Sequence, residues 1–179
     1  MFPIIETSGL ILREVTENDA EDLFEYFSQE KVMSHYGQEA FERIEDIQRL
    51  IAIFRSNYEA KKGIRWGIQP KEDERLIGTV GFNAWSTKHK RAEIGYELNP
   101  LYWRKGITSE AVERVISYGF ETLSLNRIGA IVYLENSGST NLLQKVGFRK
   151  EGVLRDYLYS YGESHSVNMY SLLKEEWLR

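Results

Sequence analysis

The sequence predicts a single α/β domain over residues 1–179, built on a mixed, mostly antiparallel sheet of about seven strands with about four helices against it. Some segments repeat apolar residues at helical spacing, whereas others are short apolar runs bounded by turn residues. Residues 91–134 read as strand, helix and strand, the order of a parallel βαβ unit with a right-handed crossover. No repeat, low-complexity segment or linker divides the chain, which is long enough to bury one core.

The N-terminal third is expected to contain one strand and two helices. Residues 10–13 form a short apolar strand candidate, and cap-type residues at 16–19 precede a helix. Residues 31–42 show no regular pattern. From Ile44 onward, apolar residues recur at helical spacing, which predicts a long helix that Gly63 ends.

The middle of the chain is expected to form an antiparallel meander of three strands. Strand-like runs at 64–69 and 76–85 flank a polar turn, and a second polar turn leads to a strand at 91–99. Pro100 closes the meander, because proline has no N–H group to donate to a sheet.

The C-terminal part is expected to alternate helices and strands. A helix after Gly106 has a wide apolar face, and a near-continuous apolar run at 128–134 predicts a strand covered on both faces. A short helix follows at 139–146, and strands at 148–161 and 165–173 read as a final hairpin.

The composition excludes several classes of protein. The chain has no cysteine, which excludes disulfides, thiolate nucleophiles and cysteine-based zinc sites. Its three histidines lie in separate segments without ligand spacing, so no metal site is expected. The net charge of −4 suits a cationic partner, such as an amine or a basic polypeptide, better than nucleic acid. Because neither a signal peptide nor a long apolar run is present, we expect a cytoplasmic protein without a membrane partner.

The segment 102–112 (Tyr-Trp-Arg-Lys-Gly-Ile-Thr-Ser-Glu-Ala-Val) joins a predicted strand to a predicted helix and is the main candidate for a binding site. Gly106 permits a tight turn or the close approach of a ligand, and Thr108 and Ser109 are N-cap residue types. The first N–H groups of a helix have no partners within the helix, and they lie at the positive end of its dipole.

These N–H groups, together with Arg104 and Lys105, would hold a phosphate group. An ordinary capped helix start with two solvated cations explains the segment equally well. Its place at the carboxyl end of a strand in a βαβ unit favours the phosphate site. The glycine spacing of a Walker loop or a Rossmann fingerprint is absent.

Residues 91–111 (Arg-Ala-Glu-Ile-Gly-Tyr-Glu-Leu-Asn-Pro-Leu-Tyr-Trp-Arg-Lys-Gly-Ile-Thr-Ser-Glu-Ala) resemble the acetyl-CoA-binding segment of the GNAT superfamily of N-acetyltransferases. Two further blocks agree: residues 135–141 leading to 145–152, and residues 10–13 followed by 18–20. Within the superfamily the chain is similar to the RimJ/RimL-type branch, which acetylates the N-termini of ribosomal proteins.

The resemblance implies a GNAT-type fold with a splayed pair of parallel strands at the cofactor site, and acetyl-CoA as the cosubstrate. The pyrophosphate is expected on backbone N–H groups of the loop, and the thioester carbonyl on a backbone N–H at the end of the preceding strand. Asn136 is expected to bond the pantetheine arm, with capping of its own turn as the alternative. The residues implied to bind the cofactor are Leu98, Asn99, Arg104, Lys105, Gly106, Ile107, Thr108, Ser109, Asn136 and Asn141.

Proton transfer requires a base for the amine and an acid for the leaving thiolate. Glu93 and Glu97 lie on one face of a strand, roughly 13 Å apart at about 3.3 Å per residue, so they cannot serve one proton together. Glu97 is the first candidate for the base and Glu93 the second; solvated strand carboxylates are the alternative. Leu143 stands where many superfamily members carry a tyrosine acid, and Ser139, otherwise a helix cap, is the substitute that the branch suggests. Three tyrosines offer further hydroxyl groups: Tyr133, Tyr157 and Tyr159.

The resemblance implies direct transfer of an acetyl group to a primary amine in a ternary complex. The expected acceptor is the N-terminal α-amine of a protein such as a ribosomal protein, because deprotonating a lysine at pH 7 would cost about 4.6 kcal/mol and an α-amine less. A polyamine, an amine-bearing antibiotic or a non-catalytic CoA-binding module are the alternatives. No direct nucleic-acid partner is expected, and a homodimer is compatible with the sequence.

Overall fold

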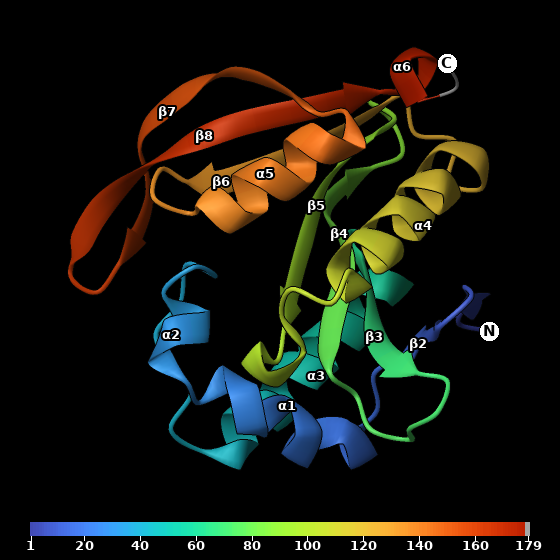
Figure 1. The fold of residues 1–179 in the computed structure, drawn as a ribbon, viewed down its shortest axis with the longest axis vertical. Helices are drawn as coiled ribbons and strands as arrows, with labels where there is room; N and C mark the ends of the chain where they lie inside the picture. The colour runs from blue at the N-terminus through green and yellow to red at the C-terminus, as the bar shows by residue number, and fades with distance from the viewer. Residues whose placement is uncertain (178–179) are drawn as a thin grey trace.

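The computed structural model describes residues 1–177 and is drawn as a ribbon in Figure 1. Within these residues, eight strands form one open sheet in the order β1-β2-β3-β4-β5-β6-β8-β7. Their bounds are β1 (Ile5–Glu6), β2 (Leu10–Glu14), β3 (Ile64–Pro70), β4 (Gly78–Ser86), β5 (Arg91–Leu98), β6 (Arg127–Tyr133), β7 (Arg149–Ser160) and β8 (Glu163–Leu173). Neighbouring strands are antiparallel except β5 and β6. The predicted mixed sheet is confirmed, and the two-residue β1 is the strand that sequence pattern did not predict.

The helices are α1 (Ala20–Phe27), α2 (Glu30–Met33), α3 (Ile44–Glu59), α4 (Ile107–Glu121), α5 (Ser137–Val146) and α6 (Lys174–Trp177), with 3₁₀ turns at Glu17–Asp19 and Pro100–Tyr102. The four longer helices match the predicted ones. The two four-residue helices were not predicted, because one turn is too short to show a helical period. No helix of the described residues is long and apolar enough to cross a membrane.

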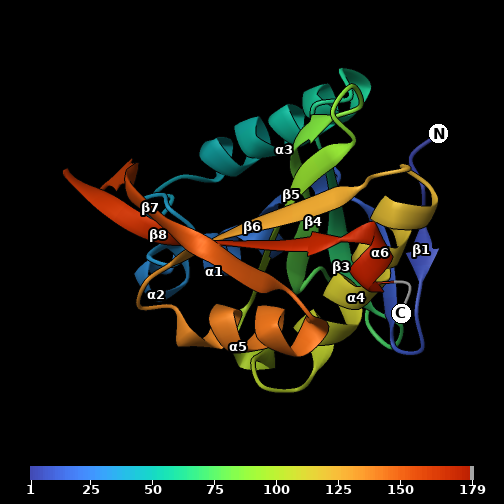
Figure 2. The ribbon, with the colours of Figure 1, turned by 90° about the horizontal axis from the view of Figure 1, so that it is seen from above.

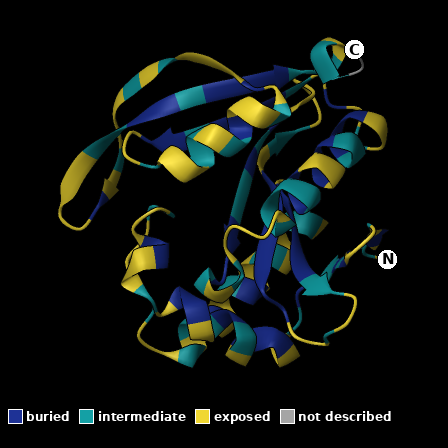
Figure 3. Cartoon of the chain, in the orientation of Figure 1, coloured by how far each residue is buried: buried dark blue, intermediate teal, exposed yellow. Residues whose placement is uncertain are grey.

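The sheet separates two groups of helices. Figure 2 shows α4 and α5 on one face and α3 on the other. Successive side chains of β3 point to opposite faces of the sheet. The Trp66 ring packs edge-on against Tyr118 of α4. The guanidinium of the neighbouring Arg65 lies 5.9 Å from the ring of Phe54 in α3. The buried residues therefore form two clusters, which appear dark blue in Figure 3. One lies between the sheet and α4, and the other joins α1 and α3.

The parallel pair confirms the predicted splay. β5 and β6 share only three residue pairs, which end at Glu93↔Gly129. Beyond this point β5 continues to Leu98 against β4, while β6 continues to Tyr133 against β8. The two strands separate there, and the edge of β5 that faces β6 has no partner strand among the described residues. Backbone groups inside a protein need hydrogen-bond partners, so the open edge is suited to a ligand.

The predicted C-terminal hairpin is present, and its second strand, β8, inserts between β6 and β7. Positive φ angles at Tyr161 and Gly162 form its tight turn. The turn contacts the segment that precedes α3, where the Tyr161 hydroxyl donates to the carbonyl oxygen of Gln38 at 3.3 Å.

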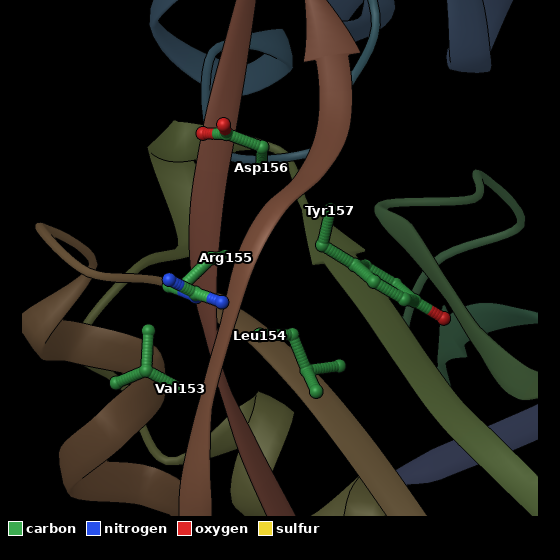
Figure 4. A pocket seen from close by; sticks show the side chains of 5 residues that line it. All are labelled: Val153, Leu154, Arg155, Asp156 and Tyr157. Carbon is green, nitrogen blue, oxygen red and sulfur yellow. The ribbon is translucent and has the colours of Figure 1, made fainter.

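A bulge interrupts the outer strand β7 between Leu154 and Leu158. Figure 4 shows the side chains at this bulge, around a shallow recess of about 590 Å³. Asp156 has a φ of 49°, and its N–H group donates to Ser166 Oγ at 3.1 Å. The recess is lined only by residues 153–157 of this one strand. The bulge bends an exposed sheet edge, which hinders pairing with another strand, and it brings no second element to the recess.

Candidate active site

A cleft of about 990 Å³ opens where β5 and β6 separate. The loop after β5, the first turn of α4 and the first turn of α5 line one side, and the segment 32–38 together with α3 lines the other. We call these the cofactor side and the acceptor side. Of the predicted site residues, all except Asn99 and Asn141 line this cleft. Asn141 is exposed on α5, so its predicted contact with the cofactor stays a prediction.

The loop before α4 forms an anion-binding cradle. The helix begins at Ile107, with Gly106 as its N-cap at a φ of +77°, so Thr108 and Ser109 lie in the first turn and do not cap it. Glu110 N donates to Gly106 O at 3.1 Å. Within the described chain, the N–H groups of the three residues before Glu110 have no protein acceptor. A Cβ atom at Gly106 would have no atom within 4 Å, so this turn is open toward the cleft.

Two aromatic residues organise this loop. The Trp103 indole Nε1 donates to the carbonyl oxygen of Leu98 at 2.8 Å, which fastens the loop to the end of β5. Lys105 Nζ lies 5.2 Å from the centre of the Tyr102 ring, a cation–π contact. Arg104 is exposed, has a φ of 61° and makes no ion pair within residues 1–177. The contact of Arg104 with a phosphate group therefore stays a prediction.

A carboxylate in the first turn of α4 is held away from the cradle. Glu110 Oε1 accepts from Ser8 Oγ at 3.0 Å and from Gly9 N at 2.9 Å. A hydrogen bond from Thr7, followed by those from Gly9 and Ser8, lowers the pKa of Glu110 against the opposing effect of burial. The β1–β2 turn thus binds Glu110, which is the one acidic side chain in the first turn of α4. The free N–H groups of α4 therefore stay available for an anion.

Two predicted cofactor residues, Asn136 in the cleft and Asn99 at the end of β5, have structural partners. Asn136 is the N-cap of α5, and its Oδ1 accepts from Ser139 N at 3.1 Å, so this oxygen has the capping role that was the alternative. Asn99 is buried, and its N–H group donates to Ile77 O at 2.7 Å. Its side chain bonds Leu101 N and Glu25, each at 3.1 Å. Of the two N–H groups expected near the thioester, that of Asn99 is therefore already engaged.

Glu97 is the centre of a buried polar network on the acceptor face of β5. Its carboxylate forms an ion pair with Arg65, and it accepts hydrogen bonds from the hydroxyls of Thr79 and, at 3.3 Å, Tyr26. The side chains of Arg65 and Glu97 are only 3% and 5% exposed. A buried carboxylate is tolerated when a cation and further donors compensate it, and both conditions hold here.

Arg65 extends the network beyond Glu97. Its Nε donates to Thr79 Oγ1 at 2.7 Å and its Nη1 to Gly95 O at 3.0 Å, while Nη2 also reaches the Tyr36 hydroxyl at 3.1 Å. A Cβ at Gly95 would lie 3.0 Å from this guanidinium, so the glycine makes room for it. Burial raises the pKa of Tyr36 to about 12, which keeps this hydroxyl protonated at the edge of the cleft.

Sequence reasoning missed Arg65, Tyr26 and Tyr36, because they come from three segments distant from β5. One local signal was available, since Arg65 is a lone charge inside the apolar run Ile64–Ile68. Glu93, the second carboxylate of the same face, lines the cleft and forms no ion pair in the described part of the chain. The two candidate bases therefore differ in electrostatic environment.

The candidate acid Ser139 meets a tyrosine that the sequence did not suggest. Its Oγ lies 2.6 Å from the hydroxyl of Tyr96, and both residues line the cleft. Burial raises the pKa of Tyr96 to about 12. Leu143, at the position of the usual tyrosine acid, is fully buried in the core. No group of three or more potential metal ligands occurs among the described residues.

A splayed parallel strand pair beside a helix start with free N–H groups defines a protein class that binds an anionic ligand between the two strands. Residues 9–149 match the family of acetyltransferase (GNAT) domains. The chain is 51% identical over 174 residues to the uncharacterized N-acetyltransferase YoaA of Bacillus subtilis (strain 168), covering 97% of this chain and 98% of that protein. A solved GNAT-family acetyltransferase from Bacillus anthracis superposes with a TM-score of 0.85 at 29% identity, covering 97% of this chain and 100% of that one. The protein belongs to the GNAT acetyltransferases.

Two more distant proteins have named acceptors. The chain is 25% identical over 185 residues to the [ribosomal protein uS5]-alanine N-acetyltransferase of Escherichia coli (strain K12), covering 97% of this chain and 92% of that protein. A spermidine N-acetyltransferase from Vibrio cholerae, solved in complex with CoA and spermine, has the same fold, with a TM-score of 0.84 at 23% identity and coverage of 97% and 100%.

The family and the cleft agree on the cosubstrate. As a GNAT N-acetyltransferase, the protein uses acetyl-CoA, which supplies the acetyl group as an activated thioester. The residues present fit this molecule: the free N–H groups at the start of α4 suit a pyrophosphate, and the open edge of β5 suits an extended arm of amides.

Proposed function

We propose that the protein acetylates the N-terminal α-amine of a protein, such as a ribosomal protein, by direct attack of the amine on the thioester. The observation that carries this proposal is the chemistry of the acceptor side, which is neutral and aromatic where it faces β5. Such an acceptor places the reaction in the cytoplasm. The 25% identity to an alanine N-acetyltransferase of a ribosomal protein supports the same acceptor class.

The acceptor side offers amides and rings rather than carboxylates. Its polar side chains are His35, Tyr36, Gln38 and Asn57, and Phe54 is among its apolar ones. Asn83 of β4 adds a further amide to the cleft, on the face of the sheet that carries Arg65. Amide side chains can bond the peptide groups of a polypeptide N-terminus, which carries a single cationic group. A polyamine carries several cations, and each cation that loses its water on binding would need its own carboxylate.

Few carboxylates are free for that purpose. Glu97 is already compensated by Arg65. Glu93 and Glu135 are the cleft carboxylates without an ion pair within residues 1–177, and Glu135 lies on the α5 side. One free carboxylate beside the acceptor matches one amine better than a chain of three or four.

The proton-transfer roles follow from the same geometry. Glu97 is our first candidate for the base that receives the amine proton, and its network fixes its carboxylate beside the splay. Glu93 is the second candidate, and Ser139 is the candidate acid. Glu93→Gln and Glu97→Gln variants distinguish the two: loss of the base lowers the rate most at low pH, because at high pH the amine loses its proton without help.

The acceptor class is tested by turnover of acetyl-CoA on matched amines, followed by release of the CoA thiol. The panel contains short peptides with a free N-terminus, the same peptides with a blocked N-terminus and a free lysine, spermidine, spermine and an aminoglycoside. We expect kcat/KM for the free N-termini to exceed that for every other amine by at least about tenfold, a difference of about 1.4 kcal/mol in transition-state binding. A higher kcat/KM for spermidine would overturn the proposal in favour of a small amine.

A second readout uses the cell that produces the protein. Mass spectrometry of its ribosomal proteins, before and after deletion of the gene, should show at least one N-terminus that loses its acetyl group. Unchanged N-terminal acetylation, together with poor turnover of all free N-termini, would rule out this acceptor.

A further inference from the structure

We propose that Tyr96 is a positioning residue for the acid: it donates its phenolic hydrogen to Ser139 Oγ, which directs the hydrogen of the Ser139 hydroxyl into the cleft toward the departing sulfur. This inference rests on the proposed role of Ser139. It adds a residue from the opposite wall of the splay, and it explains how the site works with a leucine at the position of the usual tyrosine acid.

The first step of the argument is the geometry across the splay. Tyr96 lies on β5 beyond the last residue paired with β6, and Ser139 lies in the first turn of α5. Their hydroxyl oxygens are 2.6 Å apart, and both side chains line the cleft. Tyr96 alternates with Glu97 along the strand, so it points to the face opposite the Arg65–Glu97 network. The contact thus joins the two elements between which the thioester would lie.

The second step fixes the direction of the hydrogen bond. Ser139 is not needed as a cap, because Asn136 Oδ1 caps α5 through Ser139 N at 3.1 Å. Ser139 Oγ is the only hydrogen-bond partner of the Tyr96 hydroxyl within the described residues. A phenol is a more acidic and therefore stronger donor than an aliphatic alcohol, so Tyr96 donates and Ser139 accepts. The raised pKa of Tyr96, due to burial, keeps the phenol protonated for this purpose.

The third step is the consequence for proton transfer. When the C–S bond breaks, its electron pair goes to sulfur, and the Ser139 hydroxyl gives its proton to that sulfur. As charge develops on Ser139 Oγ, Tyr96, the more acidic of the two hydroxyls, passes its own proton to that oxygen across the 2.6 Å contact. The Tyr96 phenolate then recovers a proton from solvent as the products leave. A hydrogen bond to a developing charge is stronger than a neutral one, so Tyr96 acts mainly on kcat.

The test is a double-mutant cycle with Tyr96→Phe and Ser139→Ala. We expect Ser139→Ala to lower kcat by about a hundredfold and Tyr96→Phe by about tenfold, with little change in KM for acetyl-CoA. In the double variant, Tyr96→Phe should cause no further loss, because the residue through which it acts is gone. Tyr118→Phe, which removes a hydroxyl from α4 outside the cleft, is the matched control, and thermal unfolding checks that each variant folds.

A binding measurement provides a readout that does not depend on turnover. CoA bound to the protein is titrated through the ultraviolet absorbance of its thiolate. A Ser139 hydroxyl whose hydrogen points at the sulfur donates a hydrogen bond to the thiolate form of CoA and stabilises it. The pKa of the bound thiol should therefore lie below that of the free thiol. Both Tyr96→Phe and Ser139→Ala should move it back toward the free value.

The outcomes separate this inference from the proposed function. Additive losses in the double variant, or a bound thiol pKa that Tyr96→Phe leaves unchanged, would overturn the role of Tyr96 while Ser139 stays the acid. Full activity of Ser139→Ala would overturn the acid itself, and the inference with it. Neither outcome bears on the acceptor, which the amine panel decides separately.

Discussion

The two sides of the cleft are built in different ways. The cofactor side presents backbone N–H groups at the start of α4, and the charged side chains next to them, Arg104 and Lys105, are exposed. The acceptor side depends on side chains, above all the buried pair of Arg65 and Glu97. The difference teaches that CoA binding should tolerate changes of the exposed side chains at Arg104 and Lys105 unless they alter the backbone, whereas truncation of a buried side chain in the Arg65–Glu97 network should destabilise the protein.

The largest expected effect tests the acceptor side. Arg65→Met leaves the buried Glu97 without its cation, and removing one partner of such a pair costs about 3 kcal/mol or more. Urea unfolding at pH 7 measures the loss. The control is Arg127→Met, which breaks the more exposed pair with Glu151 and should cost about 1 kcal/mol or less. Equal losses for the two variants would remove the contrast between the sides.

The next effect tests the backbone of the cofactor side. Gly106→Val places a β-branched residue at a φ of +77°, which costs about 2 kcal/mol and disturbs the cradle. Gly162→Val is a matched control, because Gly162 has the same φ in the hairpin turn and a Cβ there also meets nothing. Both variants should lose similar stability in urea, but only Gly106→Val should lose CoA binding in calorimetry. If both bind CoA as the wild type does, the pyrophosphate lies elsewhere.

A smaller effect tests the contact that orients Glu110. Glu110→Gln should lower the free energy of unfolding by about 1 kcal/mol at pH 7. Because the pKa of Glu110 is lowered in the folded protein, its contribution is present above the pKa of an unfolded glutamate, about 4.3, and is lost as the pH falls through the folded value. The free energy of unfolding, measured from pH 6 to pH 3, should therefore fall less steeply for Glu110→Gln than for Glu113→Gln. Glu113 is an exposed glutamate of the same helix and serves as the control. Identical slopes would contradict the role of the β1–β2 turn.

The smallest effect sharpens the cofactor side itself. Arg104→Ala should change CoA affinity by less than about threefold if the backbone supplies the binding, since an exposed cation contributes little. Calorimetry at low and high salt measures it. A tenfold loss that disappears with 3′-dephospho-CoA would instead assign Arg104 to the 3′-phosphate.

The same contrast explains how much could be predicted from the sequence. The meander, the parallel pair and the loop before α4 are local or consecutive in the chain, so periodicity and spacing located them. Within these segments the start of α4 differs from the prediction, which had Thr108 and Ser109 as N-cap residue types. Gly106 takes the N-cap position, because a glycine adopts its left-handed conformation without strain.

The acceptor side could not be predicted in this way. Arg65 of β3 and Tyr26 of α1 reach Glu97 directly, and Tyr36 joins them through Arg65. Nothing in the spacing of these residues predicts a common network. The partner of Ser139 was hidden for the same reason, because Tyr96 looks like one more apolar position in an alternating strand. Tertiary packing, and not local pattern, determines which of these polar groups meet.

The contact between Tyr161 and Gln38 has a consequence for the order in which the site is completed during synthesis. These residues are separated by 123 positions, and the hydrogen bond links the hairpin turn to the segment that lines the acceptor side. A chain emerging from the ribosome can form the start of α4 and the cap of α5 once residue 146 has been made. The acceptor side, although its own segments come earlier in the chain, gains this hydrogen bond only after residue 161 has been made.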